Sequence, residues 1–185
     1  VSLQFRADRA GVPDPAEAAA LITNRTRAIV LVTPNNPTGA VYPPKTIAAF
    51  RDLAREHGIA LIIDETYKDF LEASPPHDLF LDDRWGETVV QLYSFSKAFS
   101  LPGYRVGSVI AGEKTIAAVT KVMDTISICA PRISQDAALF GLENLTDWVS
   151  DKRAMINARR DGIREIFRSN DLGYELISSG AYFAY

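Results

Sequence analysis

Several kinds of functional site need residues that this 185-residue chain has in small number. A single cysteine, Cys129, cannot form an internal disulfide or a multi-cysteine metal site. With only two histidines, His57 and His77, a histidine-rich metal centre is not expected either. The apolar runs are far too short to cross a bilayer, and the N-terminus lacks the pattern of a secretory signal. These absences favour a reducing, cytoplasmic setting and a site without metal.

Strong charge of one sign is also missing. The chain has 20 basic and 23 acidic side chains, so its formal net charge is only −3. No run of lysine and arginine is long enough to grip a nucleic-acid backbone. No string has the form G-x-x-x-x-G-K-[ST] that cradles nucleotide phosphates. We therefore expect neither a nucleic-acid nor a membrane partner.

What the first third does contain is the pattern of an α/β protein. Ala28–Val32 and Ile59–Ile63 are short, continuous apolar runs, which is the pattern of strands buried on both faces. Between them, Lys45–His57 has apolar residues at helical spacing, and Gly58 follows as a stop signal. Strand, helix and strand in this order predict a parallel pair joined by a right-handed crossover.

Two further strands are predicted after a turn-rich segment. Ala73–Arg84 is rich in proline and aspartate and is expected at the surface. Thr88–Tyr93 and Val106–Ala111 then have the composition of strands. The gap between them, Ser94–Arg105, is too short for a helical crossover, so the last strand should run antiparallel to its neighbours.

The rest of the chain is mainly helical by pattern. Helices are expected at Glu113–Asp124, Ser134–Asn144 and Thr146–Asn170, followed by strands at Tyr174–Ile177 and Ala181–Tyr185. The longest helix has an apolar stripe that we expect to pack against the rest of the protein; it consists of Trp148, Val149, Met155, Ile156, Ile163 and Ile166. Residues 1–144 would then form part of a large domain, and residues 145–185 a linking helix and the start of a small α+β domain.

Three segments that carry chemically functional side chains follow predicted strands. They are Pro34–Gly39 (PNNPTG), Asp64–Tyr67 (DETY) and Ser94–Lys97 (SFSK), the last of which leads through a Pro-Gly turn to Arg105. The carboxyl ends of parallel strands meet at one edge of a sheet, where such proteins bind ligands. Each segment also has an ordinary interpretation, because the first is a typical turn, the second resembles the magnesium-binding strand of a nucleotide hydrolase, and loop lysines are usually solvated.

Taken in this order, PNNPTG, DETY and SFSKAFSLPGYRVG resemble the fold-type-I pyridoxal-phosphate enzymes, specifically the class I/II aminotransferases. The last string is the most specific, since serine stands three residues before the lysine and arginine eight after it. The resemblance spans essentially the whole chain. It implies a mostly parallel sheet flanked by helices, as in the large domain of these transferases. It also implies pyridoxal 5′-phosphate as cofactor, an L-amino acid and a 2-oxo acid as substrates, and a homodimer.

By the same resemblance, Lys97 forms the Schiff base with the cofactor aldehyde and later moves the Cα proton. Removal from water and the charge of Arg105 would both favour the free amine of that lysine. Asp64 would keep the pyridine nitrogen protonated, so that the ring accepts electrons from Cα.

The remaining cofactor contacts are implied residue by residue. Tyr67 and Asn36 would approach the ring's phenolic oxygen from two sides, and the Asn36–Pro37 bond resembles the family's cis proline. Ser94, Ser96 and Arg105 would hold the phosphate, the arginine by a two-pronged contact.

Other residues in these segments receive structural interpretations. Glu65 and Lys68 are assigned to the surface or to ion pairs, and both histidines are expected to carry no chemistry. Gly103 and Gly107 would let the backbone turn and approach a neighbour closely, while Tyr104 would pack.

A complete member of this family is about twice as long as this chain. The glycine-containing phosphate turn, the aromatic ring that stacks on the cofactor and the arginine that grips the substrate carboxylate have no match here. We therefore expect weak or no turnover from these 185 residues alone. Four alternatives remain: another fold-type-I enzyme (carbon–sulfur lyase, synthase or decarboxylase), a non-catalytic cofactor-binding fragment, the ligand-sensing domain of a regulator, and a nucleotide hydrolase.

Overall fold

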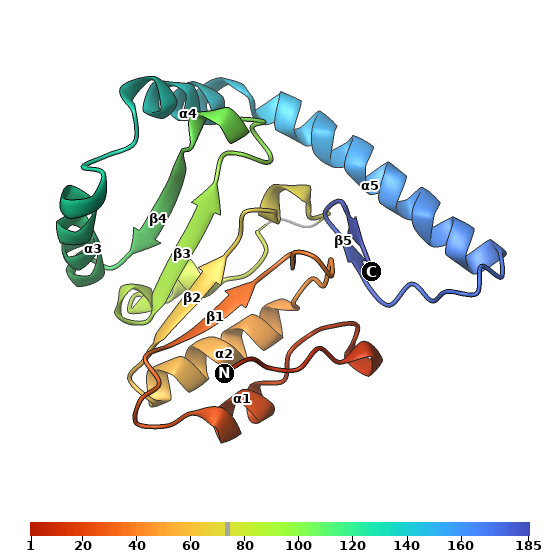
Figure 1. The fold of residues 1–185 in the computed structure, drawn as a ribbon, viewed down its shortest axis with the longest axis horizontal. Helices are drawn as coiled ribbons and strands as arrows, with labels where there is room; N and C mark the ends of the chain where they lie inside the picture. Colours follow the sequence, from red (N-terminus) through yellow and green to blue (C-terminus); the bar gives the residue numbers. More distant parts are fainter. Residues whose placement is uncertain (73–74) are drawn as a thin grey trace.

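A four-stranded sheet forms the centre of the computed structural model, which describes residues 1–72 and 75–185 (Figure 1). Its strands are β1 (Ala28–Val32), β2 (Ala60–Asp64), β3 (Val89–Ser94) and β4 (Gly107–Ala111), in that spatial order. The first three are parallel, whereas β4 pairs antiparallel with β3. The four strands predicted between Ala28 and Ala111, the mostly parallel α/β fold and the reversed fourth strand are confirmed, with ends that differ by one residue at most.

Two helices pack beside the first strands. Helix α2 (Pro44–Glu56) agrees with the predicted helix within a residue at each end, and Gly58 adopts φ +60° just beyond it. Helix α1 (Pro15–Leu21) was not predicted, although its sequence carries a start signal: Asp14 accepts the N–H of Ala16 and proline occupies the first helical position.

The main core lies between the sheet and α2. Its most deeply buried members are large apolar side chains from strands and helix together: Ile47, Phe50, Leu61, Ile63, Leu79 and Val89. The residues of β1 are covered unequally, because Leu31 is 3% exposed and the adjacent Val30 61% exposed. The prediction that β1 is buried on both faces is therefore wrong for the described residues, whose helices α1 and α2 cover one face of it.

The proline- and aspartate-rich segment differs from its prediction. Residues 73–74 of the predicted span Ala73–Arg84 lie outside the described residues. Of the remainder, His77 and Leu79 are buried, so this part is not simply a surface loop. Leu79 is fully buried because it fills the core beneath β2 and β3.

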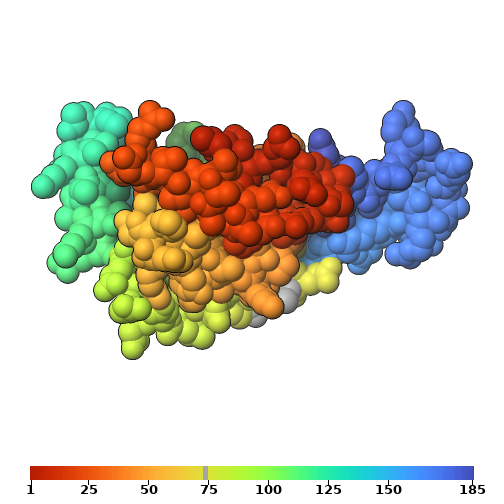
Figure 2. Space-filling model, turned by 90° about the horizontal axis from the view of Figure 1, so that it is seen from below, coloured from red at the N-terminus to blue at the C-terminus, as the bar shows by residue number. Residues whose placement is uncertain are grey.

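The second half of the chain is helical and extends the molecule. Helix α3 (Glu113–Ile126) contacts β4, while α4 (Arg132–Asn144) leads into the 24-residue α5 (Thr146–Ser169). Figure 2 shows α3 and α5 at opposite ends of an elongated molecule, with the N-terminal segment between them. Across the described ranges, no helix combines the length and apolar character needed to cross a membrane.

The apolar stripe of α5 is covered only in part. Val149 and Ile156 pack against a cluster that contains Tyr67 and Phe70, as expected. Other members of the stripe are more than a third exposed: Met155, Ile163 and Ile166. The packing prediction is wrong for those three because no described element lies over that part of the helix.

The chain ends in a short hairpin of β5 (Ser179–Gly180) and β6 (Phe183–Ala184). The predicted strand Tyr174–Ile177 is wrong, since among the described residues the segment pairs only at its end, where the Ile177 N–H donates to the Tyr185 carbonyl oxygen at 2.7 Å, and Tyr174 is 81% exposed. The other predicted strand begins later than expected, because Ala181 adopts φ 49° and forms the turn.

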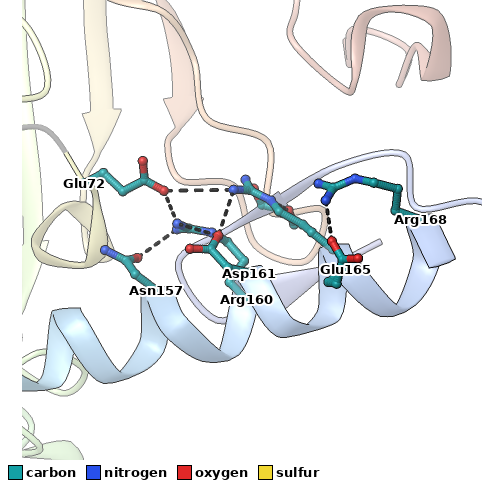
Figure 3. A network of polar contacts seen from close by, with 8 residues as sticks. Glu72, Asn157, Arg160, Asp161, Glu165 and Arg168 are labelled. Carbon is teal, nitrogen blue, oxygen red and sulfur yellow. Dashed lines mark hydrogen bonds and ion pairs between the residues drawn. The ribbon is translucent and has the colours of Figure 1, made fainter.

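An arginine network on α5 holds two other segments in place (Figure 3). Arg160 is 5% exposed; it bonds to Glu72, which follows the β2 segment, and to the Asn157 Oδ1 atom at 2.8 Å. One turn further on, Arg164 donates to the Ser179 hydroxyl at 2.8 Å and to its carbonyl oxygen at 3.1 Å. Helix α5 therefore fixes both the segment after β2 and the terminal hairpin.

Candidate active site

The three predicted segments do meet at one edge of the sheet. The register pairs Val32 with Asp64 and Asp64 with Leu92, so β1, β2 and β3 end side by side. PNNPTG, DETY and SFSK begin within two residues of these ends. The parallel topology thus brings together residues that are far apart in the sequence.

Tyr67 and Asn36 form the clearest contact at this edge. The Asn36 side-chain amide donates a hydrogen bond of 3.1 Å to the Tyr67 hydroxyl. The tyrosine is 6% exposed, in a cluster with Phe70, whereas Asn36 is exposed. The predicted cis bond between Asn36 and Pro37 is confirmed, and a second cis bond, between Thr33 and Pro34, was not predicted.

Lys97 lies beside this pair. Its Nζ atom is 5.9 Å from the centre of the Tyr67 ring. The side chain is exposed, so the expected removal from water is not present in this chain. An amine held against an aromatic face but open to solvent is accessible to a small-molecule carbonyl.

Asp64 ends β2 and is half-buried. One carboxylate oxygen, Oδ1, accepts the N–H of Thr66 at 3.0 Å, which fixes the orientation of the side chain. Among the described residues, the other oxygen has no hydrogen-bond partner and is available to a ligand.

The residues predicted to hold the phosphate, Ser94, Ser96 and Arg105, are brought together less completely. The Ser94 hydroxyl accepts the N–H of Ser96 at 3.2 Å, so these two residues share one tight turn. Arg105 is exposed, with φ 51°, and donates to the carbonyl oxygen of Pro102 at 2.8 Å. Strand pairing still keeps it near, because Ser94 pairs with Gly107, two residues beyond the arginine.

Among the structural interpretations near Arg105, only Gly107 is confirmed. A Cβ atom there would lie 2.7 Å from the Tyr93 carbonyl oxygen, so only glycine allows this approach. Gly103 has open space around it and no positive φ, which contradicts its predicted role. Tyr104 is 39% exposed, so the prediction that it packs is wrong as well.

Behind Asp64 lies a buried polar cluster that the sequence did not indicate. Glu65 is fully buried, so of its two predicted alternatives the surface position is wrong and the ion pair agrees with His77 Nε2, which lies 3.1 Å from its carboxylate. Gln91 also donates to that carboxylate. His77 Nε2 and Glu65 Oε1 lie within ion-pair distance, but neither atom has a hydrogen bond of good geometry. Because His77 Nδ1 accepts the N–H of Leu79, a neutral imidazole carries its proton on Nε2, towards Glu65.

A hydrogen bond that was also not predicted links the segments that carry Tyr67 and Ser94. The Tyr93 hydroxyl donates to Asp69, whose carboxylate also lies 3.2 Å from the Lys68 ammonium. The expected ion pairing of Lys68 is thereby confirmed. Burial, followed by the bond to Asp69 and its charge, raises the pKa of Tyr93 well above its ordinary value of 10.0.

The terminal hairpin closes one side of the site. Ser178 donates to the carbonyl oxygen of Thr38 at 2.6 Å, and a Cβ atom on Gly39 would lie 2.8 Å from the Gly180 nitrogen. This close approach explains the glycine of PNNPTG, which also adopts φ +70°. Phe183 places its ring edge-on to Tyr67, with 4.9 Å between ring centres.

Comparison with known proteins agrees with this arrangement. The sequence model of the family described as "Aminotransferase class I and II" matches residues 9–185. The aspartate aminotransferase of Sulfurisphaera tokodaii is 32% identical over 146 residues, which are 79% of this chain and 36% of that protein. The aromatic amino acid aminotransferase of Mycolicibacterium vanbaalenii is 34% identical over 166 residues, 90% of this chain and 46% of that protein.

The solved structures lead to the same family. A double mutant of Thermus thermophilus aspartate aminotransferase superposes with a TM-score of 0.88 at 31% identity, over 100% of this chain and 48% of that one. This chain thus spans less than half the length of each of these relatives. These likenesses favour the resemblance over the nucleotide hydrolase suggested by the apolar run before Asp64-Glu65. The chain belongs to the class I and II aminotransferases.

Proposed function

We propose that this chain supplies the cofactor-binding part of a pyridoxal-phosphate-dependent aminotransferase, with Lys97 as the residue that holds the cofactor. The single observation that carries the proposal is the meeting of Lys97, the Asn36–Tyr67 pair and Asp64 at adjacent strand ends. Family membership supports it independently.

The donor set fits the chemistry of the cofactor. An amine suits an aldehyde, a carboxylate suits a protonated ring nitrogen, and a phenol with an amide suits a phenolic oxygen. Two contacts support this combination: Lys97 Nζ is 5.9 Å from the centre of the Tyr67 ring, and the Asn36 amide donates to the Tyr67 hydroxyl. The half-buried Asp64 has one oxygen available.

Pyridoxal phosphate, when bound, supplies an aldehyde that captures amino groups and a ring that withdraws electrons from the substrate Cα. Asp64 would hold the proton on the ring nitrogen, because a carboxylate beside it favours the charged form. Lys97, once released by the incoming amino acid, would carry the proton between the substrate Cα and the cofactor C4′ atom. The exposed position of its amine suits a group that must exchange partners.

Ser94, Ser96 and Arg105 would hold the phosphate. The tight turn that joins the two serines presents hydroxyl and N–H groups together. Arg105 uses one nitrogen on the Pro102 carbonyl, which leaves further N–H donors of its guanidinium for an anion.

The proposal extends to the whole protein. Its substrates would be an L-amino acid and a 2-oxo acid, with residues 1–144 in a large domain and 145–185 at the start of a small one. A homodimer is supported by large apolar side chains that are strongly exposed around α3 and α4, namely Ile126, Ile128 and Ile133. The resemblance further suggests a cytoplasmic location.

A titration with pyridoxal phosphate tests the role of Lys97. We expect a visible absorption band with the unmodified chain and with Lys121→Ala, which removes an exposed lysine of α3. Lys97→Ala should lose the band. A band of equal size in Lys97→Ala would remove that residue from its proposed role.

The reaction type needs a second test. The chain, with cofactor, an amino acid and 2-oxoglutarate, should form glutamate wherever turnover is measurable. Release of ammonia or pyruvate instead would favour a lyase of the same fold.

A further inference from the structure

Two segments at the ends of neighbouring strands carry the two halves of the proposed cofactor site. The carboxylate segment, residues 64–72, contains Asp64 and Tyr67. The lysine segment, residues 93–105, contains Lys97 and the two serines proposed to hold the phosphate. Pairing of β2 with β3 aligns the two segments only where they begin. Further along, their separation depends on contacts between side chains.

Tyr93 reaches from the lysine segment to the carboxylate segment. Its ring lies edge-on to Phe95, with 5.2 Å between ring centres, and Phe95, which stands between the two serines in the sequence, is buried. The Tyr93 hydroxyl donates to a carboxylate oxygen of Asp69. Beyond the paired strands, this is the only hydrogen bond among the described residues that joins the two segments. One side chain thus contacts both halves of the site.

Lys68 supports the same bond from the side. Its ammonium lies 3.2 Å from the other carboxylate oxygen of Asp69 and 5.2 Å from the centre of the Tyr93 ring. Both oxygens of Asp69 are therefore engaged, one by a hydroxyl and one by a charged amine. A carboxylate held at both oxygens keeps one orientation. The acceptor for the Tyr93 hydroxyl is thus fixed in place.

We propose that Asp69 and Tyr93 are positioning residues that set the distance between the two halves of the cofactor site. Their polar groups are engaged with each other and with Lys68, so neither is assigned a contact with the cofactor. They act through Asp64 on one side and Lys97 on the other. This inference rests on the proposed function, because it concerns the separation of groups that the cofactor would join.

Ligands that contact both segments should depend on this bond. Lys97 would hold the aldehyde of pyridoxal phosphate while Asp64 holds its ring nitrogen, so cofactor affinity depends on the distance between these two residues. Without the Tyr93–Asp69 bond, the segments adopt more separations and have to be ordered when the cofactor binds, which weakens binding. A reagent that contacts only the Lys97 amine does not meet this cost.

The dissociation constant for pyridoxal phosphate, measured by titration of the visible absorption band, tests this role. Tyr93→Phe and Asp69→Ala should each raise it about 3- to 10-fold, the equivalent of one hydrogen bond. Asp69→Asn keeps an oxygen that can accept from Tyr93 and should retain most of the affinity. Asp83→Ala, which removes an exposed carboxylate outside both segments, should leave the dissociation constant unchanged.

A double variant separates action through the bond from independent effects of the two residues. Tyr93→Phe combined with Asp69→Ala should bind the cofactor no more weakly than either single variant. Losses that multiply in the double variant, or unchanged affinity in both single variants, would overturn the inference. An equal loss in Asp69→Asn and Asp69→Ala would overturn it as well. Absence of any band in the unmodified chain would instead count against the proposed function.

The reactivity of Lys97 provides a readout that needs no cofactor. Formaldehyde with cyanoborohydride methylates exposed amines, and peptide mapping gives the rate at Lys97 relative to Lys121, an exposed lysine of α3. Because the reagent contacts only the amine, this ratio should be the same in the unmodified chain, Tyr93→Phe and Asp69→Ala. A ratio that changed in step with cofactor affinity would show that the variants disturb Lys97 itself, and would overturn the inference.

Discussion

The Asn36 side-chain nitrogen lies 3.1 Å from the hydroxyl oxygen of Tyr67, although the two residues are 31 positions apart. They follow neighbouring parallel strands, and the register of β1 and β2 brings their loops together. A cofactor would therefore meet an amide and a phenol that already hold each other in place, which lowers the cost of ordering them on binding.

Removal of this amide should weaken cofactor binding. Asn36→Ala loses a donor to Tyr67, so we expect the dissociation constant for pyridoxal phosphate to rise about 3- to 10-fold. A titration with pyridoxal phosphate, followed by the visible absorption band, measures this dissociation constant. The matched variant is Asn24→Ala, in an exposed turn away from the site. Equal affinity of Asn36→Ala and the unmodified chain would mean that the amide takes no part.

Replacement of two glycines by alanine should change the free energy of unfolding in opposite directions, because their surroundings differ. Gly107→Ala places a Cβ atom 2.7 Å from the Tyr93 carbonyl oxygen and should lower the free energy of unfolding by about 1–3 kcal/mol. Gly162→Ala, inside α5 with open space around it, should raise that free energy by about 0.5–1 kcal/mol. Urea denaturation checks both. An unchanged free energy of unfolding in Gly107→Ala would contradict the close approach of β3 and β4.

The buried carboxylate next to Asp64 should matter for stability. Glu65→Ala leaves the polar groups of Gln91 and His77 buried without their partner, so the free energy of unfolding should fall by roughly 3–5 kcal/mol. Glu56→Ala, at the exposed end of α2, serves as the comparison and should change it by less than about 0.5 kcal/mol. Similar stabilities of the two variants would contradict the burial of Glu65.

Alkaline pH should destabilise the chain partly through Tyr93. Its pKa in the folded state is raised above the ordinary value of 10.0, so the folded chain keeps a proton that the unfolded chain loses. This contribution is complete below pH 10 and is lost as pH rises beyond it. Unfolding midpoints measured between pH 8 and about pH 11 should therefore fall less steeply in Tyr93→Phe. A parallel decline in Tyr93→Phe and the exposed variant Tyr174→Phe would argue against the Tyr93–Asp69 bond.

Strand patterns and local motifs were sufficient to predict the sheet and the site edge. The apolar runs ending near Val32 and Asp64 have the composition of buried parallel strands, and the short gap after Ser94 allows only a reversed neighbour. Motif order then placed Asn36, Tyr67 and Lys97 at one edge, since parallel strands end on the same side.

The failures involve tertiary contacts that leave no local pattern. Glu65 resembles any charged residue in a turn, and its burial depends on Gln91 and His77, each supplied by a distant segment. The predicted strand Tyr174–Ile177 had a plausible composition but, among the described residues, pairs with another segment only at Ile177. Pairing and burial are properties of the assembled fold, so composition alone could not decide them.

The most direct test of the central claim is to locate the site of cofactor attachment. Borohydride reduction of the chain with pyridoxal phosphate, followed by peptide mapping with mass spectrometry, identifies the modified lysine. We predict stoichiometric modification at Lys97, on the peptide that also carries Ser94 and Ser96. Modification spread over the exposed lysines, with Lys97 left unmodified, would contradict the account.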